Sequence, residues 1–143
     1  MPVFELLTAV FLCVLSVTDL RTKTIPGWAS PAFGIAMGIL HLLLPGMTLP
    51  ECLMGLIPGA GLLVLSLIFR ASMGVGDACA VMACGVAIGA ERIFAELTAA
   101  FVLCAMLCAV LLIMKKIRRS DSLAFLPFLA SSHMIVLIVK VVS

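Results

Sequence analysis

The chain has 143 residues, of which 64% are hydrophobic and only 11% are charged, with a formal net charge of +2. Soluble domains contain about 45–50% apolar residues, so this composition predicts an integral membrane protein. A single domain, residues 1–143, is expected. The composition excludes a separate soluble catalytic domain and a nucleic-acid-binding domain, because no long polar segment is present to form one.

Six apolar stretches predict six transmembrane helices, since about 20 helical residues cross the hydrocarbon layer of a bilayer. The expected helices are 3–18, 29–44, 52–69, 77–90, 95–114 and 123–142. The first stretch contains Glu5 but no lysine or arginine, so it lacks the basic start of a secretory signal and is expected to be a retained helix. The predicted fold is therefore an all-α polytopic membrane protein.

The basic residues predict how these helices are oriented. Of nine lysines and arginines, seven fall in the loops after the first, third and fifth helices, and two fall on the other side. The seven are Arg21, Lys23, Arg70, Lys115, Lys116, Arg118 and Arg119, and the two are Arg92 and Lys140. Because cytoplasmic loops carry the excess of positive charge, we expect the larger group to be cytoplasmic and both termini to be extracytoplasmic.

The third stretch contains a pair of glycines four residues apart, Gly55 and Gly59, with Pro58 between them. Such a GxxxG pair favours close packing against another helix, although a hinge at Pro58 is an alternative. His133 lies in an otherwise apolar stretch and is expected to be a structural histidine with satisfied hydrogen bonds. Proton transfer or ligand contact is the alternative role for it.

The six cysteines lie in or near apolar stretches, and no two of them form a CxxC pair. This pattern predicts small apolar packing residues rather than a zinc site. Cys104 and Cys108 share one helix face at i, i+4 spacing, so a disulfide or a metal site there stays open as an alternative.

Two aspartates, Asp19 and Asp77, are expected at the same edge of the membrane. Asp19 closes the first predicted helix and Asp77 opens the fourth, and both helix ends face the cytoplasmic side. Taken separately, Asp77 could simply cap its helix, and Asp19 could be a surface residue balanced by the basic residues that follow it. A carboxylate at a helix C-terminus is unfavourably placed in the helix dipole, which favours a functional reason for Asp19.

Paired carboxyl groups are suited to amide hydrolysis. When two are close, both cannot easily be ionised, so one keeps a proton and the other does not. The ionised group takes a proton from water while the protonated group polarises the scissile carbonyl. Gly74 and Gly76, just before Asp77, would let the backbone lie against an extended substrate segment.

Three segments, in order, resemble the type IV prepilin peptidases, which are polytopic aspartyl proteases with a GxGD motif. They are Asp19-Leu20-Arg21 followed by Ile25-Pro26, then Gly74-Val75-Gly76-Asp77, and last Pro127-Phe128-Leu129. The short length is similar to the small tight-adherence (Tad) pilus branch. The resemblance implies that Asp19 and Asp77 are the catalytic pair, and that the substrate is a prepilin or pseudopilin precursor cut at the cytoplasmic face of the inner membrane.

The resemblance also implies differences from larger family members, which carry a cytoplasmic zinc loop and methylate the new amino terminus. This chain has no room for such a loop, so a peptidase with no metal, no cofactor and no methyltransferase activity is expected. Many relatives have asparagine at the position of Gly27, and lysine at the position of Cys79. The second departure removes a positive group near the expected site.

Two other classes of function remain as alternatives. A small membrane transporter or channel component is one, because intramembrane carboxylates also mark ion pathways. A transporter would hold its carboxylates near the midplane, whereas these two are expected at one interface. A non-catalytic pilus assembly subunit is the other, and a cleavage assay would distinguish it. The lipid bilayer is an expected partner and nucleic acid is not; the sequence does not predict an oligomeric state.

Overall fold

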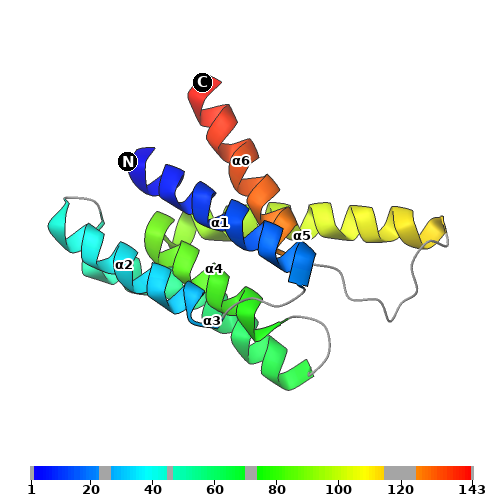
Figure 1. Ribbon diagram of the computed structural model, residues 1–143, viewed down its shortest axis with the longest axis horizontal. Coiled ribbons are helices and arrows are strands. Elements are labelled where there is room, and N and C mark those ends of the chain that lie inside the picture. Colours follow the sequence, from blue (N-terminus) through cyan, green and yellow to red (C-terminus); the bar gives the residue numbers. More distant parts are fainter. Residues whose placement is uncertain (1, 23–26, 45–46, 70–73, 115–124, 143) are drawn as a thin grey trace.

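The computed structural model describes residues 2–22, 27–44, 47–69, 74–114 and 125–142. Within these ranges the chain forms α-helices and no strand, which confirms the predicted all-α class (Figure 1). The helices are α1 (Pro2–Thr22), α2 (Ala29–Leu43), α3 (Leu49–Phe69), α4 (Val75–Ile88), α5 (Ala90–Ile113) and α6 (Leu126–Val142). The predictions for Lys23, Ile25, Pro26, Arg70 and the basic loop 115–122 lie outside the described residues.

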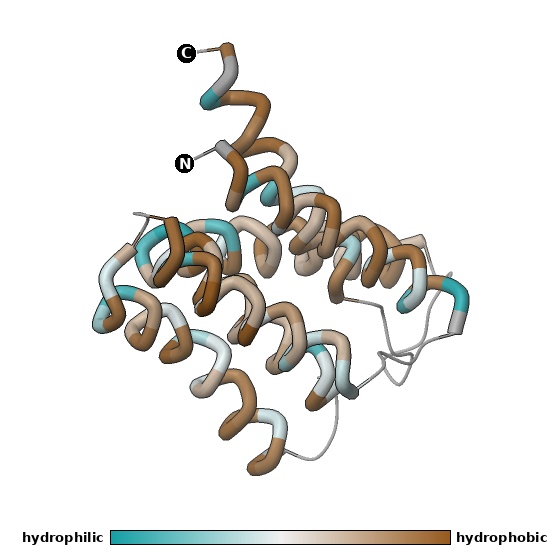
Figure 2. Tube along the Cα trace, turned by 60° about the vertical axis from the view of Figure 1, so that its left-hand side comes forward, coloured by the Kyte–Doolittle hydropathy of each residue, from teal (hydrophilic) through white to brown (hydrophobic). Residues whose placement is uncertain are grey.

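Three of the helices are long and apolar enough to cross a membrane, α1 over Val3–Arg21, α3 over Leu49–Ile68 and α5 over Ala90–Ile113. The helices α2, α4 and α6 are apolar but shorter. Figure 2 shows hydrophobic residues along most of the tube, including helices at the edge of the bundle. An apolar exterior suits a protein solvated by lipid, and the number of spans and their orientation remain predictions.

The boundaries of α1, α4 and α5 differ from the prediction. The first helix continues through Asp19 to Thr22, so Asp19 lies within its last turn instead of ending it. The fourth helix begins two residues early, at Val75, and ends at Ile88. Gly89 then takes φ 91°, a backbone conformation that favours glycine, and α5 starts directly after it. Arg92, expected in a loop, therefore lies in the first turn of α5.

The centre of the fold is α4, which packs against α1, α2, α3 and α5. Its side chains are mostly alanine, glycine and cysteine, and all its residues from Ala83 to Ile88 are buried. Short side chains let neighbouring helices approach closely. The predicted packing role of Gly55 and Gly59 is confirmed, because a β-carbon on Gly55 would collide with Gly85 of α4 and one on Gly59 would collide with Met82.

Aromatic stacking joins α1 to α2. The rings of Phe11 and Phe33 stack with centroids 3.9 Å apart, and those of Phe4 and His41 stack with centroids 4.0 Å apart. His41 is buried, with its Nε2 3.1 Å from the backbone oxygen of Ala87 at the end of α4. These contacts tie the first half of the chain to the central helix.

The packing role expected for the cysteines holds for two of the six. Cys52 and Cys84 are buried, whereas Cys13 is exposed and the other three are half-buried. All six thiols are free, and the sulfur atoms of Cys104 and Cys108 lie 4.0 Å apart on α5 without a disulfide. Cys104 and Cys108 lie beyond Ala100, the last buried residue of α5, and this part of the helix extends away from the bundle (Figure 1). Helical spacing therefore brings these two thiols together on a half-buried face of α5.

Candidate active site

Asp19 is held in the interior by the periodicity of α1. The buried residues Thr8, Leu12 and Leu15 recur at three- and four-residue spacing along one face of this helix, and Asp19 continues the same face. Only 7% of Asp19 is exposed. Its Oδ2 atom is buried and has no hydrogen-bond partner among the described residues. An unsatisfied buried carboxyl oxygen costs stability, so its retention points to a functional role.

Asp77 is the third residue of α4 and is half-buried. Its Oδ2 accepts a hydrogen bond from the backbone N–H of Gly74 at 3.3 Å. Gly74, and not Asp77, occupies the N-cap position, and Asp77 reaches back to it from the first turn. The helix start thus orients this carboxyl group, and the positive end of the helix dipole stabilises its negative charge.

Asp19 and Asp77 lie on α1 and α4, two helices that pack against each other. Their carboxyl groups are close enough that the negative charges of Asp19 and Asp77 repel each other. Among the described residues, no basic side chain forms a hydrogen bond or an ion pair with either aspartate. Such a pair favours holding one proton between two carboxyl groups, which is the state that acid–base catalysis on an amide requires.

Gly74 and Gly76 lie beside this pair in different backbone conformations. Gly74 is exposed and extended, with φ −67° and ψ 141°. A β-carbon built on Gly74 would be 3.6 Å from Asp77 Oδ2, an ordinary contact. Gly76 is half-buried in the first turn of α4. Among the described glycines only Gly89 has a positive φ, so backbone strain does not explain a glycine at position 74 or 76.

Cys79, at the position where many relatives have lysine, lines a different part of the protein. Its side chain borders an apolar cavity of about 310 Å³ between α2, α3 and α4, together with Ser30, Met82 and Val86. Residues two apart on a helix point to different faces, so Cys79 and Asp77 project in different directions. Ser30 is buried there, and its hydroxyl has no hydrogen-bond partner among the described residues.

A second polar cluster, at the other end of α1, includes residues that the sequence interpretation missed. Glu96 of α5 is buried and both its carboxylate oxygens lie 2.9 Å from His133 Nδ1 of α6. Ser132 donates to the backbone oxygen of Glu96 at 2.7 Å. His133 is thus the satisfied buried histidine that was predicted. A carboxylate in an apolar stretch was the signal that could have identified Glu96 as its partner.

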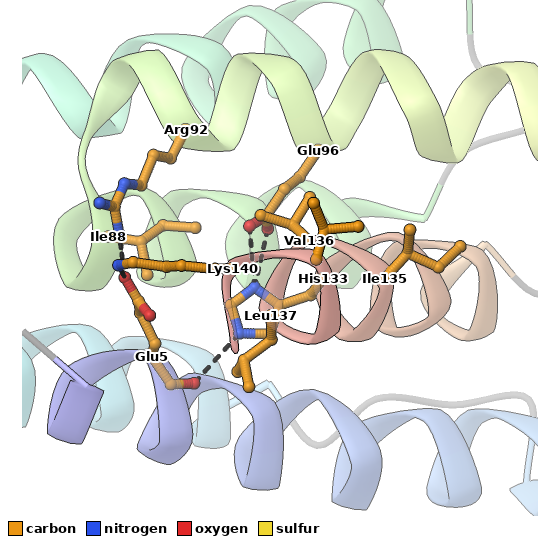
Figure 3. A pocket seen from close by; sticks show the side chains of 10 residues that line it. Glu5, Ile88, Arg92, Glu96, His133, Ile135, Val136, Leu137 and Lys140 are labelled. Atoms are coloured by element: carbon orange, nitrogen blue, oxygen red, sulfur yellow. Dashed lines mark hydrogen bonds and ion pairs between the residues drawn. The ribbon is translucent and has the colours of Figure 1, made fainter. Parts of the chain in front are cut away.

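The same cluster includes Glu5, whose carboxylate is bound by Arg92 and Lys140 (Figure 3). Glu5 and Asp19 are fourteen residues apart on α1, a rise of about 21 Å. Lys140 near the C-terminus and Glu5 near the N-terminus are in contact, so both chain ends lie at one end of the bundle (Figures 1 and 2). The two aspartates lie toward the opposite end.

The fold and this geometry define an all-helical membrane protein with a pair of neighbouring aspartates. Residues 6–114 match the type IV leader peptidase family, and the chain belongs to that family. The match covers both aspartates and most of the five helices α1 to α5. It confirms the resemblance drawn from the motifs and makes the protein a peptidase that processes protein substrates. Neither the curated proteins nor the solved structures contain a match to this chain.

Proposed function

We propose that the protein is an aspartic endopeptidase in which Asp19 and Asp77 hydrolyse the leader-peptide bond of prepilin-like precursors at the cytoplasmic face of the inner membrane. The observation that carries this proposal is the buried carboxyl group of Asp19, unpartnered on one oxygen and within electrostatic reach of Asp77. Both residues fall inside the family match.

The reaction needs one proton shared by the two carboxyl groups. The ionised group takes a proton from a water molecule as that water attacks the scissile carbonyl carbon, and the protonated group donates to the carbonyl oxygen. The pair then returns a proton to the leaving amine. The two aspartates act as a unit, so neither is assigned the acid or the base role alone.

The start of α4 supports substrate binding beside the pair. The first N–H groups of a helix have no acceptor within the helix, so those of Val75 and Gly76 are suited to donate to a substrate carbonyl oxygen as it becomes negative. Gly74 is extended and exposed next to them. An extended precursor segment can therefore lie along Gly74 and reach Asp77, with its apolar helix remaining in the bilayer.

Substituting each aspartate by asparagine tests the proposal. Asp19→Asn and Asp77→Asn keep the side-chain size but remove the proton exchange, so each is expected to lower cleavage of a co-reconstituted prepilin-type precursor by at least about 100-fold. Glu91→Gln, a matched change at an exposed residue in the first turn of α5, should cleave at the unaltered rate. Cleavage is followed by the size of the precursor, and the melting temperature of each purified variant shows whether it is folded.

Normal processing by either asparagine variant would refute the two-aspartate mechanism. The same assay addresses the two alternative functions. A non-catalytic assembly subunit or a transport component would leave the precursor uncut with the unaltered protein as well.

A further inference from the structure

A cavity of about 510 Å³ lies at the end of α1 that is opposite the two aspartates. It is formed by α1, α5 and α6 with Ile88 at the end of α4, and its walls are mostly apolar (Figure 3). The apolar residues of α6 that line it include Ile135, Val136 and Val139. These three side chains are also exposed on the outside of α6. The cavity is therefore open to the surface that lipid covers in a membrane.

Five polar side chains line this cavity, and three of them form one ion-pair cluster: Glu5, Arg92 and Lys140. Lys140 Nζ lies 2.6 Å from Glu5 Oε1, and Arg92 Nη1 binds the same oxygen (Figure 3). The side chains of Arg92 and Lys140 are 47% and 50% exposed, whereas that of Glu5 is 12% exposed. Within this cluster one negative charge faces two positive charges, so one positive charge is left over. Glu51, across a neighbouring cavity that Glu5 and Arg92 also line, accepts a hydrogen bond from the Thr48 N–H instead. Arginine has five N–H donors and lysine three, so both retain donors for a second anion.

The buried pair beneath the cations does not cancel this charge. His133 Nδ1 faces the Glu96 carboxylate, and His133 Nε2 is 3.1 Å from the backbone oxygen of Glu5. With acceptors at both ring nitrogens, either the ring carries two protons and Glu96 is ionised, or the ring is neutral and Glu96 holds the shared proton. The pair is electrically neutral in both cases. The excess positive charge at Arg92 and Lys140 therefore remains.

We propose that this cavity binds an anionic phospholipid, with its phosphate at Arg92 and Lys140 and an acyl chain along the apolar face of α6. An anionic head group complements the excess positive charge, and an acyl chain complements the apolar walls of the cavity. A soluble anion would complement the charge but not the apolar walls. The site is about 21 Å along α1 from Asp19, on the side of the bundle away from the proposed active site. The proposal does not depend on the proposed cleavage reaction.

Lipid binding to the purified full chain in a neutral detergent tests this, using native mass spectrometry with phosphatidylglycerol and phosphatidylcholine of the same acyl chains. We expect phosphatidylglycerol to bind more tightly. Arg92→Gln and Lys140→Gln should each weaken it about fivefold. Glu5→Gln should strengthen it by a similar factor, because it removes the carboxylate that competes for the same donors. Arg21→Gln, an equal charge change on the exposed part of α1 near its other end, should have no effect.

A variant that keeps every charge separates the acyl-chain site from the phosphate site. In Val136→Trp the larger side chain occupies the space next to the apolar wall of the cavity. This change should weaken the binding of phosphatidylglycerol and leave any binding of glycerol phosphate unchanged. The melting temperature is measured for every variant, so that weakened binding is scored only in folded protein.

Four results would overturn the proposal. The first is equal affinity for the two lipids, and the second is an Arg21→Gln effect as large as that of Arg92→Gln, which would show general surface attraction. The third is glycerol phosphate binding as tightly as the lipid, which would indicate a site for a soluble anion. Weaker binding by a folded Glu5→Gln variant would also contradict it, because the cluster would then serve only to join the helices.

Discussion

Gly55 of α3 and Gly85 of α4 pack backbone against backbone, so closely that neither position has room for a β-carbon. Gly85 lies about two turns after Asp77 on the same helix. Because α4 carries Asp77, the distance between α3 and α4 at this contact also sets how far Asp77 lies from α3. This contact links a packing motif with no chemistry of its own to the geometry of the aspartate pair.

Alanine at either position of this contact should destabilise the protein. For Gly55→Ala and Gly85→Ala we expect a loss of about 1–3 kcal/mol in the free energy of unfolding, because the two helices must separate. Cleavage should fall as well, since α4 carries Asp77. Gly61→Ala on the same helix α3 is the matched control, because a β-carbon there meets nothing within 4 Å. Thermal unfolding in detergent and the cleavage rate are measured for all three, and a Gly55→Ala variant as stable as Gly61→Ala would contradict the packing role.

Gly74→Ala and Gly76→Ala should separate substrate approach from packing. The space around Gly74 accepts a β-carbon, and alanine is favoured over glycine in the helix turn that holds Gly76. The melting temperature should therefore be unchanged or slightly higher. If the precursor lies against this backbone, a displacement of about 1 Å can lower the cleavage rate by about 100-fold. A rate that falls only in step with stability would show that these glycines have no role in substrate binding.

Removing one partner of the buried Glu96–His133 pair should cost more stability than removing both. His133→Leu leaves Glu96 as an uncompensated buried acid, with an expected loss of about 3–5 kcal/mol. The double substitution to leucine should recover part of this loss, which a double-mutant cycle on thermal unfolding would measure. Ser131→Ala is the control, because this exposed hydroxyl donates only to the Pro127 backbone oxygen of its own helix. Equal losses for the single and double variants would mean that the pair is not coupled.

Chelators should leave the proposed cleavage unchanged, because two carboxyl groups and a water molecule suffice for the chemistry. The described residues hold no group of three or more side chains suited to a metal ion. The measurement is the cleavage rate before and after treatment with EDTA. Loss of activity that zinc restores would show a metal requirement.

Composition and local motifs determined the class of this protein. The apolar stretches are long, and helical hydrogen bonding inside each segment is the stable way to satisfy a backbone in lipid, so the six helices follow from the sequence alone. The aspartate after Gly74 and Gly76, and the GxxxG pair of α3, are also recognisable locally. These features depend on residues that are close together in the chain, so they can be predicted from the sequence alone.

Only the tertiary structure decided which side chains meet. Asp19 turns inward because α1 continues to Thr22 and keeps the three- to four-residue spacing of its buried face, and a helix ending at residue 18 would not have placed it there. Gly85 gave no distinct local signal, and the carboxylate of Glu96 in an apolar stretch was a signal that did not show which residue it meets. Each acquires its role from a partner on another helix, Gly55 and His133. Such contacts depend on the relative rotation and separation of whole helices. Those quantities result from packing over the full length of each helix, and no short segment of sequence encodes them.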